Sequence, residues 1–326
     1  MIVALKRLAR RALAGIGVDP SELVYAVAAA CMGFFKIVDR AENRRNPMVN
    51  IGGSRFYKRH WMIMDHRHER SRHYDFAGLD YDYDLMSGAP FPFADDSVRF
   101  FYSSNTLEHV LDRFLPHVFA EMHRCLRPGG AVRIQVPDFT FTYDAMKRED
   151  YSAVMNLCGD GATNRFTAMA KLYGVEVARR RLRGWPETPK IESGDVSRER
   201  VLREFFRDFA GYQVGKVAYD QAIADLKALD VAEFGDRYAA AIPIDWQRRN
   251  PHEHCTWFDG PKLVRLLGNA GFSEIEVTPP FASRFDEMRG VGNYWSFDHR
   301  RSETSVYVEA VKGTAAGKYP TFRDNP

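Results

Sequence analysis

The amino-acid sequence predicts an α/β fold in which helices flank a mostly parallel sheet. Four short runs have the apolar or alternating composition of buried strands: residues 48–51, 61–64, 98–102 and 131–136. Between the last two runs, apolar residues recur at three- and four-residue intervals from Leu115 to Leu126, which is typical of a helix. Strands that alternate with helical segments favour a parallel sheet with right-handed crossovers.

Turn and helix signals indicate where these elements end. Asp65 closes the second run and Pro137 stops the fourth. Pro116 lies near the start of the predicted helix, and residues 128–130 (Pro-Gly-Gly) follow its end. Residues 52–65 are too few to hold a full helix between the first two strands, so we expect a loop or a single turn there.

A long helix-rich block separates this region from a second sheet-like stretch. Apolar residues recur at helical intervals in four parts of the block: 151–157, 168–183, 198–209 and 219–229. A structureless loop of this length is uncommon in a compact domain, so we interpret the block as a helical insert. After it, Asp259 and Pro261 begin a helix that Gly271 closes, and residues 275–278 and 306–311 have the composition of the last two strands.

These elements define the expected domain organisation. With 326 residues and 45% hydrophobic content, the chain can bury one large core, or a core and a subdomain. The expected parts are an N-terminal helical segment (1–45), the first part of the sheet core (46–138), the helical insert (139–253), the last part of the core (254–312) and a C-terminal tail (313–326).

The carboxyl ends of the predicted strands carry glycines and polar side chains. In an open parallel sheet, ligands bind beyond these ends, where the strand order reverses. The residues there are Gly52, Asp65, Asp84 and 103–105 (Ser-Ser-Asn). Gly52 and Gly53 let the backbone approach a ligand closely and adopt positive φ. The Asp65 carboxylate offers only acceptors when ionised, which suits the two hydroxyls of a ribose.

Short motifs occur in a fixed order through the first part of the core: 50–54 (Asn-Ile-Gly-Gly-Ser), 64–65 (Met-Asp), 82–85 (Asp-Tyr-Asp-Leu), 107–109 (Leu-Glu-His), 127–130 (Arg-Pro-Gly-Gly) and 136–138 (Val-Pro-Asp). Together they resemble the nucleotide half of a class I, Rossmann-like methyltransferase of the type 11 group, which depends on S-adenosylmethionine (SAM). The resemblance covers about the middle third of the chain. Residues 258–309 resemble this family's ending, a hairpin-like strand pair whose last strand is antiparallel to the rest.

The resemblance implies that SAM is the cofactor, and it assigns roles to the strand ends. Asp65 would hold the ribose, Asp84 would meet the exocyclic amine of adenine, and Leu85 would pack on the adenine ring. The rest of the implied cofactor-binding set is Gly52, Gly53, Ser54, Ser103 and Asn105. Ser54 stands where the family has the second glycine of a Gly-x-Gly turn, which alters the closest backbone approach. The insert would cover the mouth of the site and select the acceptor.

Each of these residues also has a purely structural interpretation. A Gly-Gly pair after a strand often forms only a turn, and Asp84 can cap a loop. A side chain that fills the space above Gly52 would argue against cofactor binding. The alternative function is therefore a protein that keeps the methyltransferase fold but serves as a catalytically inactive binding or scaffold protein.

Three residues are candidates for catalysis. Methyl transfer depends mainly on positioning, and a hydroxyl acceptor also requires a group that takes its proton. His109 follows the strand predicted at 98–102, His254 lies just before the sheet resumes, and Asp138 follows the strand predicted at 131–136. Glu108 and His109 can equally serve only to order their loop.

We assign no metal site, because no zinc-binding motif or disulfide framework is visible. The four cysteines lack paired spacing, which favours reduced thiols in the cytoplasm. The stretch that holds His66, His68 and His73 is so basic that a solvated or anion-facing loop is favoured over a metal site. One open hypothesis is a divalent ion held by His252, His254, Cys255 and Asp138. Activity that survives a strong chelator would remove it.

Charge is unevenly distributed along the chain. Residues 1–75 hold 14 Lys or Arg and 7 Asp or Glu, a net charge of +7, which leaves −4 for the remainder of the total of +3. This favours an anionic acceptor or a membrane face near the N-terminal part. The basic and aromatic pattern of a nucleic-acid-binding module is absent from the sequence, so we expect no nucleic-acid partner.

The N-terminal segment has the pattern of two helices. Residues 2–16 place apolar side chains on one side and basic ones elsewhere, which is the layout of an interfacial helix at a membrane. The alternative is a helix docked on its own domain. A second helix is predicted to start at Asp19, and its apolar run is shorter than the ~20 residues that cross a bilayer. We expect no transmembrane span, no signal peptide and a cytoplasmic protein, with peripheral membrane contact as an additional hypothesis.

The sequence after the strand predicted at 98–102 bears on which atom of the acceptor is methylated. Residues 103–106 (Ser-Ser-Asn-Thr) differ from the Asn/Asp-Pro-Pro-aromatic signature that is common in enzymes methylating amino groups of nucleobases and glutamine. This difference favours oxygen. We therefore expect an O-methyltransferase that modifies a glycan, a secondary metabolite or another small molecule through a hydroxyl group.

Overall fold

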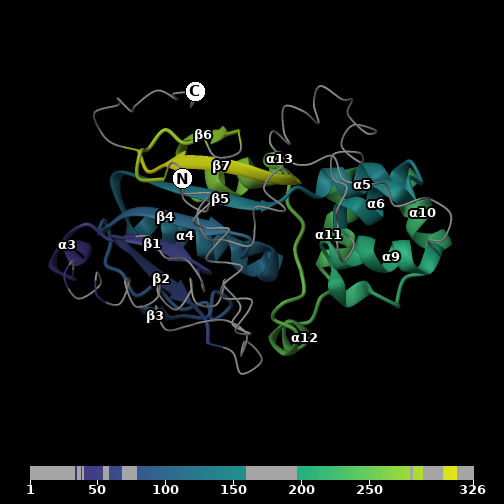
Figure 1. Cartoon of the computed structure of the whole chain (residues 1–326), viewed down its shortest axis with the longest axis horizontal. Helices are drawn as coiled ribbons and strands as arrows, with labels where there is room; N and C mark the ends of the chain where they lie inside the picture. Colours follow the sequence, from purple (N-terminus) through teal and green to yellow (C-terminus); the bar gives the residue numbers. More distant parts are fainter. Residues whose placement is uncertain are drawn as a thin grey trace, which may run out of the picture.

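A seven-stranded sheet forms the centre of the fold in the computed structural model of the chain (Figure 1). Its strand order is β3-β2-β1-β4-β5-β7-β6. All pairs among the first five strands are parallel, and β7 is antiparallel to both β5 and β6. The strands are β1 (Met48–Ile51), β2 (Trp61–Asp65), β3 (Tyr81–Asp82), β4 (Val98–Ser104), β5 (Leu126–Pro137), β6 (Ser273–Val277) and β7 (Ser305–Val311). The predicted Rossmann-like sheet with an antiparallel last strand is confirmed.

The structure describes residues 34, 38, 40–53, 59–67, 79–158, 197–279, 282–288 and 304–313. Several sequence-based predictions lie outside these residues. They are the helices predicted within 2–35 (apart from residue 34) and 168–183, the site residue Ser54, the histidines His68 and His73, and the C-terminal tail beyond 313.

The strand order reverses between β1 and β4. From β1 the chain continues to β2 and β3 on one side, and then returns to form β4 and β5 on the other. Ile51 at the end of β1 is in register with Met64 on β2 and Ser103 on β4. Such a reversal leaves a crevice beyond the carboxyl ends of the two central strands, because the connections on the two sides lead away from each other.

Helices cover the sheet and form a separate bundle. In Figure 1 most helices of the insert gather at one end of the sheet, and α12 lies apart from them, between the bundle and the sheet. Near the sheet are α3 (Arg40–Arg45), the 3-10 turns η1 (Leu107–His109) and η2 (Asp112–Phe114), α4 (Leu115–Cys125) and α13 (Gly260–Asn269). The insert holds α5 (Phe139–Lys147), α6 (Tyr151–Cys158), α9 (Arg198–Arg207), η3 (Gly211–Gln213), α10 (Tyr219–Ala228), α11 (Val231–Ala239) and α12 (Ile244–Arg249).

Several helices begin at side chains that accept from the free backbone N–H groups of the first turn. Asp138 caps α5, Asp259 caps α13, and Asp230 forms a capping box with Glu233 at the start of α11. The start of α13 at Asp259 was predicted from the sequence, whereas the bounds of α5, α11 and α12 were not. These helices are short, and short apolar patterns are ambiguous.

β5 begins earlier than the alternating pattern indicated. Residues 128–130, expected to form a turn after the preceding helix, lie within the strand as an irregular stretch. The register shifts there, because Leu126 is opposite Val98 whereas Ala131 is opposite Phe100. Gly129 has a φ of +78°, which a glycine adopts readily, so the bulge is accommodated within the strand.

Two hydrophobic layers cover the two faces of the sheet. Val49 and Ile51 of β1 pack in the cluster that also contains the apolar sides of α4 and α13. Met48, one residue away, belongs to the cluster on the other face, with Trp61 and Phe100. Adjacent strand residues therefore point into opposite layers, as the period of two in a strand requires. The insert has its own core, which is rich in aromatic side chains.

The polar positions of β5 are buried. The strand was expected to alternate apolar with polar residues, yet Arg133 is only 2% exposed. It pairs at 2.9 Å with Glu309, its register partner on β7, and donates to Thr278 at 2.9 Å. Both faces of this sheet are covered, so a polar strand residue is buried and requires a charged partner.

The insert leaves and rejoins the sheet core at one place. The Phe139 N–H at its start donates to the Phe258 carbonyl at 2.8 Å. The preceding residue, Asp138, donates its N–H to the Thr304 carbonyl at 2.9 Å, just before β7. The two chain passages that connect the bundle to the core are thus joined by a backbone hydrogen bond.

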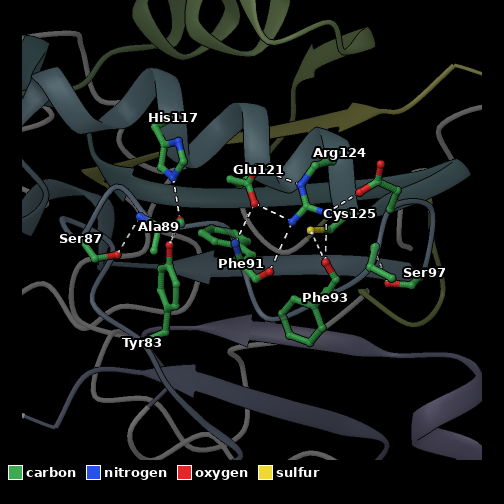
Figure 2. A network of polar contacts seen from close by, with 12 residues as sticks. Tyr83, Ser87, Ala89, Phe91, Phe93, Ser97, His117, Glu121, Arg124 and Cys125 are labelled. Carbon is green, nitrogen blue, oxygen red and sulfur yellow. Dashed lines mark hydrogen bonds and ion pairs between the residues drawn. The ribbon is translucent and has the colours of Figure 1, made fainter.

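The segment between β3 and β4 is held against α4 (Figure 2). Glu121 accepts from the Phe91 N–H at 2.7 Å and from Arg124 at 2.6 and 2.9 Å. Arg124 also donates to the Phe93 carbonyl at 3.0 Å and to Asp95 at 2.5 Å. This network holds Phe91, Phe93 and Asp95 against α4. They belong to the same segment as Asp84, which lies nearer to β3.

The same contacts shift the titration of their members. Hydrogen bonds from Arg124 hold the pKa of the Glu121 carboxyl below its usual range. Burial raises the pKa of the Cys125 thiol to about 11. Among the described residues, Cys125 and Cys255 are buried free thiols. Among the described helices, none is both long and apolar enough to cross a membrane.

Replacing Glu121 with Gln is expected to lower the free energy of unfolding at neutral pH by about 1–3 kcal/mol, because a charged acceptor for two partners is lost. The folded-state pKa of Glu121 is depressed, so its contribution is present above the unfolded value and is lost as the pH falls through the folded value. The difference between wild type and Glu121→Gln should therefore shrink on acidification. Urea unfolding at neutral pH and at about pH 3 measures it.

The matched control is Glu199→Gln, which changes an exposed glutamate in the first turn of α9. It should leave the free energy of unfolding within about 0.5 kcal/mol of wild type. A stability difference for Glu121→Gln that stayed constant across this pH range would contradict the assigned role of the Arg124 pair.

Candidate functional site

A cavity of about 300 Å³ lies beyond the carboxyl ends of β1, β2 and β4. It is at the point where the strand order reverses, as the sequence predicted. Its walls come from the strand ends, from η1 and from the C-terminal part of the insert. The lining residues are Ile51, Gly52, Met64, Asp65, His66, Tyr83, Asp84, Leu85, Met86, Asn105, Thr106, His109, Val110, Gln247, Arg248, Pro251 and His252.

Gly52 and Thr106 contact each other closely at the floor of the cavity. Gly52 has a φ of +75°, and a Cβ built on it would lie 2.0 Å from the Thr106 Oγ1. The Thr106 hydroxyl is positioned to donate to the carbonyls of Ser104, at 3.1 Å, and Ile51, at 3.3 Å. A glycine is therefore required here by packing as well as by backbone conformation, while Gly52 still lines the open cavity.

The two carboxylates predicted to bind the cofactor both reach the cavity. Asp65, at the end of β2, accepts from the His66 N–H at 2.8 Å through Oδ1. Asp84 accepts from the Met86 N–H at 2.8 Å through Oδ1, which matches the structural role of a loop cap. Its Oδ2 lies 3.7 Å from Arg248 on α12. Asp84 thus both shapes the loop after β3 and faces the insert.

Two amide side chains line the cavity with buried polar atoms that lack a hydrogen-bond partner among the described residues. For Asn105, which has a φ of +47°, these atoms are Oδ1 and Nδ2. For Gln247, which is 1% exposed, the atom is Oε1. A buried polar atom without a partner costs free energy, so these atoms are suited to hydrogen bonds with a bound ligand.

The amide of Gln247 connects the insert to η1. Its Nε2 donates to the Glu253 carbonyl at 2.9 Å and to the His109 carbonyl at 3.2 Å. Both partners are acceptors only, so they fix which end of the amide is nitrogen. The Oε1 of Gln247 is thereby oriented as an acceptor in the cavity wall.

A buried cluster adjoins the cavity at His109. The imidazoles of His109 and His254 meet edge to face, with their centroids 4.8 Å apart. Glu108 is 1% exposed, and its Oε1 lies 4.0 Å from the His254 Nε2. The Cys255 and Thr256 N–H groups donate to the Glu108 carbonyl at 2.8 and 3.2 Å, which holds the two chain segments together.

Some predicted site residues lie away from the cavity lining. Gly53 and Ser103 are buried beside it, and His254 contacts its wall through His109. The Asp138 carboxylate accepts from the Thr140 N–H at 3.1 Å as the cap of α5. Ser54 lies outside the described residues.

Other lining residues were missed or assigned differently. Thr106 directly follows the predicted strand-end residues, so extending that stretch by one position would have found it. Tyr83 and Met86 flank Asp84 and Leu85 in the same way, and burial raises the pKa of Tyr83. Gln247 and Arg248 belong to α12, more than a hundred residues later in the chain, and no local pattern connects them with the strand ends.

The lining residues fit the adenosine part of SAM by their donors and acceptors. Asp65 offers acceptors to ribose hydroxyls, Asp84 offers them to an amine, and Leu85 offers apolar surface to a ring. The amide of Asn105 adds a donor and an acceptor within the same wall. Glycine at position 52 keeps the backbone accessible on the cavity side.

Comparison with known proteins supports this fit. Residues 64–134, which span β2 to the middle of β5 and include most of these strand ends, match a family model described as a methyltransferase domain. This part of the chain therefore resembles a methyltransferase domain. A comparison with curated protein sequences gives no match.

Several solved structures are similar to this chain at low sequence identity. Phosphoethanolamine N-methyltransferase 2 of Haemonchus contortus is 11% identical, with a TM-score of 0.34, over 83% of this chain and 49% of that one. A SAM-dependent methyltransferase from Mesorhizobium loti is 14% identical, with a TM-score of 0.34, over 81% and 89%. The CurJ carbon methyltransferase is 10% identical, with a TM-score of 0.32, over 88% and 54%. The chain thus spans about half the length of the first of these.

Replacing Gly52 with Ala is expected to destabilise the methyltransferase domain and to weaken SAM binding. The new Cβ would meet Thr106 at 2.0–2.6 Å and would also occupy a positive φ. Backbone strain alone costs about 1–3 kcal/mol. Urea unfolding and calorimetric titration with S-adenosylhomocysteine measure the two effects.

Gly88→Ala is the matched control. Gly88 has a φ of +69°, and no atom of the described residues lies within 4 Å of the place that a Cβ would take. It should show the backbone cost without the collision. Equal destabilisation by the two substitutions would show that the contact between Gly52 and Thr106 is unimportant.

Proposed function

We propose that this protein transfers a methyl group from SAM to a hydroxyl oxygen of a small-molecule or sugar-containing acceptor. The observation that carries the proposal is a single cavity with two chemically different walls. One wall holds strand-end residues suited to adenosine, and the other holds His109 with side chains from the end of the insert. A methyl donor and an acceptor must meet in one space for transfer to occur.

The insert side of the cavity is suited to a polar, anionic acceptor. Arg248 brings a positive charge to the wall, and its guanidinium lies 3.7 Å from Asp84 in a loose ion pair. The Gln247 Oε1 is oriented to accept from a hydroxyl. These groups match an acceptor that combines hydroxyl groups with a carboxylate or phosphate.

Two observations support oxygen as the methylated atom. The residues after β4 and at its end are Ser103, Ser104, Asn105 and Thr106, which differ from the signature of amino-methylating enzymes. The cluster that adjoins the cavity through His109 can also take a proton. A hydroxyl acceptor must lose its proton during methylation, whereas an uncharged amine attacks through a lone pair that is already free. The His109 Nδ1 lies 3.1 Å from the Glu253 carbonyl, so it carries a hydrogen, and in the neutral imidazole the lone pair is on Nε2.

The reaction follows from these positions. SAM supplies a methyl group on a positively charged sulfur. The acceptor oxygen would have to lie in line with that methyl carbon, so that the oxygen–carbon bond could form as the carbon–sulfur bond breaks and its electrons stay on sulfur. The strand-end residues would hold the adenosine part, and the cluster at His109 would take the hydroxyl proton.

A catalytically inactive scaffold is the second candidate function. Its support is the Thr106 side chain, which fills the space that a Cβ of Gly52 would take. A protein of this kind would bind a ligand or a partner in the same cavity and transfer no methyl group.

Cofactor binding is tested by calorimetric titration of the full chain with SAM and with S-adenosylhomocysteine. Wild type is expected to bind both at micromolar concentration, and Asp65→Ala to bind at least about 10-fold more weakly, because the ribose loses a charged acceptor. Asp220→Ala, an exposed carboxylate on α10, is the control and should bind as wild type does. Absence of binding at millimolar ligand would remove the methyltransferase proposal and leave the scaffold candidate.

Acceptor recognition is tested with a panel of hydroxylated sugars with and without a phosphate or carboxylate group. Methyl transfer from isotopically labelled SAM to an anionic member is expected, and Arg248→Gln should raise its KM by about 10-fold with little change in kcat. Arg249→Gln is the control, because Arg249 is the next residue of α12 and donates to the Asp245 carbonyl away from the cavity lining. Equal effects of the two variants would rule out a specific role for Arg248.

A further inference from the structure

We propose that Glu108, His109 and His254 bind one divalent transition-metal ion at the boundary between the sheet core and the insert. Each residue contributes one potential ligand atom, and these atoms all lie within 4.8 Å of one another. Among the described residues this is the group of His, Cys, Asp and Glu side chains that meets this spacing. The site differs from the set of residues that the sequence suggested for a metal.

The two imidazoles are oriented for coordination through Nε2. The His109 Nδ1 lies 3.1 Å from the Glu253 carbonyl, and the His254 Nδ1 lies 2.7 Å from the Asp208 carbonyl. A carbonyl oxygen only accepts, so each Nδ1 carries a hydrogen, and in the neutral imidazole the lone pair is then on Nε2. A backbone carbonyl that fixes the outer nitrogen in this way is the usual support of a metal-binding histidine.

The carboxylate beside these nitrogens is deeply buried. Glu108 is 1% exposed and His254 is 9% exposed, whereas His109 is half-buried and lines the cavity. The His254 Nε2 lies 4.0 Å from the Glu108 Oε1, which is longer than a hydrogen bond. A cation bound beside this buried carboxylate would offset its charge.

The backbone around the cluster is held on several sides. Glu108 accepts from the Cys255 and Thr256 N–H groups through its carbonyl, and the His254 carbonyl accepts from the Gly211 N–H at 2.9 Å. Gln247 donates to the carbonyls of His109 and Glu253. These bonds hold the backbone that carries the three side chains before any ion binds, which lowers the entropic cost of coordination.

The ligand set indicates which ions fit. Two imidazole nitrogens and one carboxylate oxygen suit Zn²⁺, Co²⁺ or Fe²⁺ and leave coordination positions open, whereas Mg²⁺ and Ca²⁺ favour oxygen-only sites. Around a tetrahedral ion, ligand atoms lie about 3.3 Å apart. Side-chain rotations that move the ligand atoms by about 1 Å would bring the three groups to that spacing.

The other residues that the sequence suggested for a metal do not join this cluster. Cys255 lies outside the group of neighbouring ligand atoms, although it follows His254 directly. The Asp138 carboxylate caps α5, and His252 lines the cavity outside the group. Of those four residues, His254 alone belongs to the cluster.

The consequence for catalysis rests on the proposed function. Because His109 belongs both to the cluster and to the cavity wall, an ion held there would border the acceptor. It would polarise an acceptor hydroxyl and ease the loss of its proton. The cluster would then act through the ion instead of through a basic imidazole.

The test uses tag-free full-length protein that has been treated with a chelator and dialysed. It is titrated with Co²⁺, followed by visible absorption, and with Zn²⁺, followed by calorimetry. One ion per chain with a micromolar or tighter dissociation constant is expected. His254→Ala and Glu108→Gln should each weaken binding about 100-fold or more, and Glu108→Gln preserves the shape of the side chain if His254→Ala fails to fold.

His252→Ala is the matched control, because it removes an imidazole two positions away that belongs to the cavity wall and not to the cluster. It should leave metal affinity close to that of wild type. The proposal is overturned if no saturable binding occurs at millimolar Co²⁺ or Zn²⁺, or if folded Glu108→Gln binds as wild type does. It is also overturned if His252→Ala weakens binding as strongly as the cluster variants.

Metal binding and methyl transfer can fail independently. One bound ion without any methyl transfer would leave the metal site standing and remove the proposed function. Methyl transfer by protein that binds no metal would remove the metal site and leave the imidazole of His109 as the proton acceptor.

Discussion

The arrangement of the candidate site depends on the backbone contact between Glu108 and the chain at Cys255 and Thr256. One carbonyl accepts from two consecutive N–H groups, at 2.8 and 3.2 Å. The contact joins η1, which follows the central strand β4, to the segment that follows α12. Thr256 strengthens it by donating its hydroxyl to the Val110 carbonyl at 2.6 Å.

Several buried polar side chains lie close to the contact between Glu108 and residues 255–256. Glu108, Gln247 and His254 are all nearly inaccessible, and each is costly to bury in an apolar environment. The buried ion pair of Arg133 and Glu309 shows the other solution, in which two strands supply opposite charges in register. Around His109 the charges instead gather beside a cavity. Natural proteins retain costly polar groups of this kind where binding or chemistry requires them.

The methyltransferase half of the fold could be predicted from sequence because its signals are local. β1 has the predicted bounds. Asp65 closes β2, Asn105 directly follows β4, and Asp84 lies two residues after β3, so the parallel sheet brings them together. The insert side could not be predicted in this way. Gln247 reaches the cavity because of how the insert docks, and His254 reaches Glu108 through a contact between residues far apart in the chain. Asp138 has the position of a strand-end residue, yet its carboxylate satisfies a helix terminus.

The hydrogen bond between Phe139 and Phe258 has an evolutionary consequence. The bundle leaves and rejoins the core at one point, so it is equivalent to a closed loop whose two ends are in contact. Closing a longer loop costs little additional entropy, since this cost grows only with the logarithm of its length. Insertions and deletions between these two phenylalanines can therefore accumulate with little cost to the sheet. The insert that forms the acceptor-facing wall can therefore change in sequence and length among relatives, while the residues at the cofactor-facing strand ends are retained.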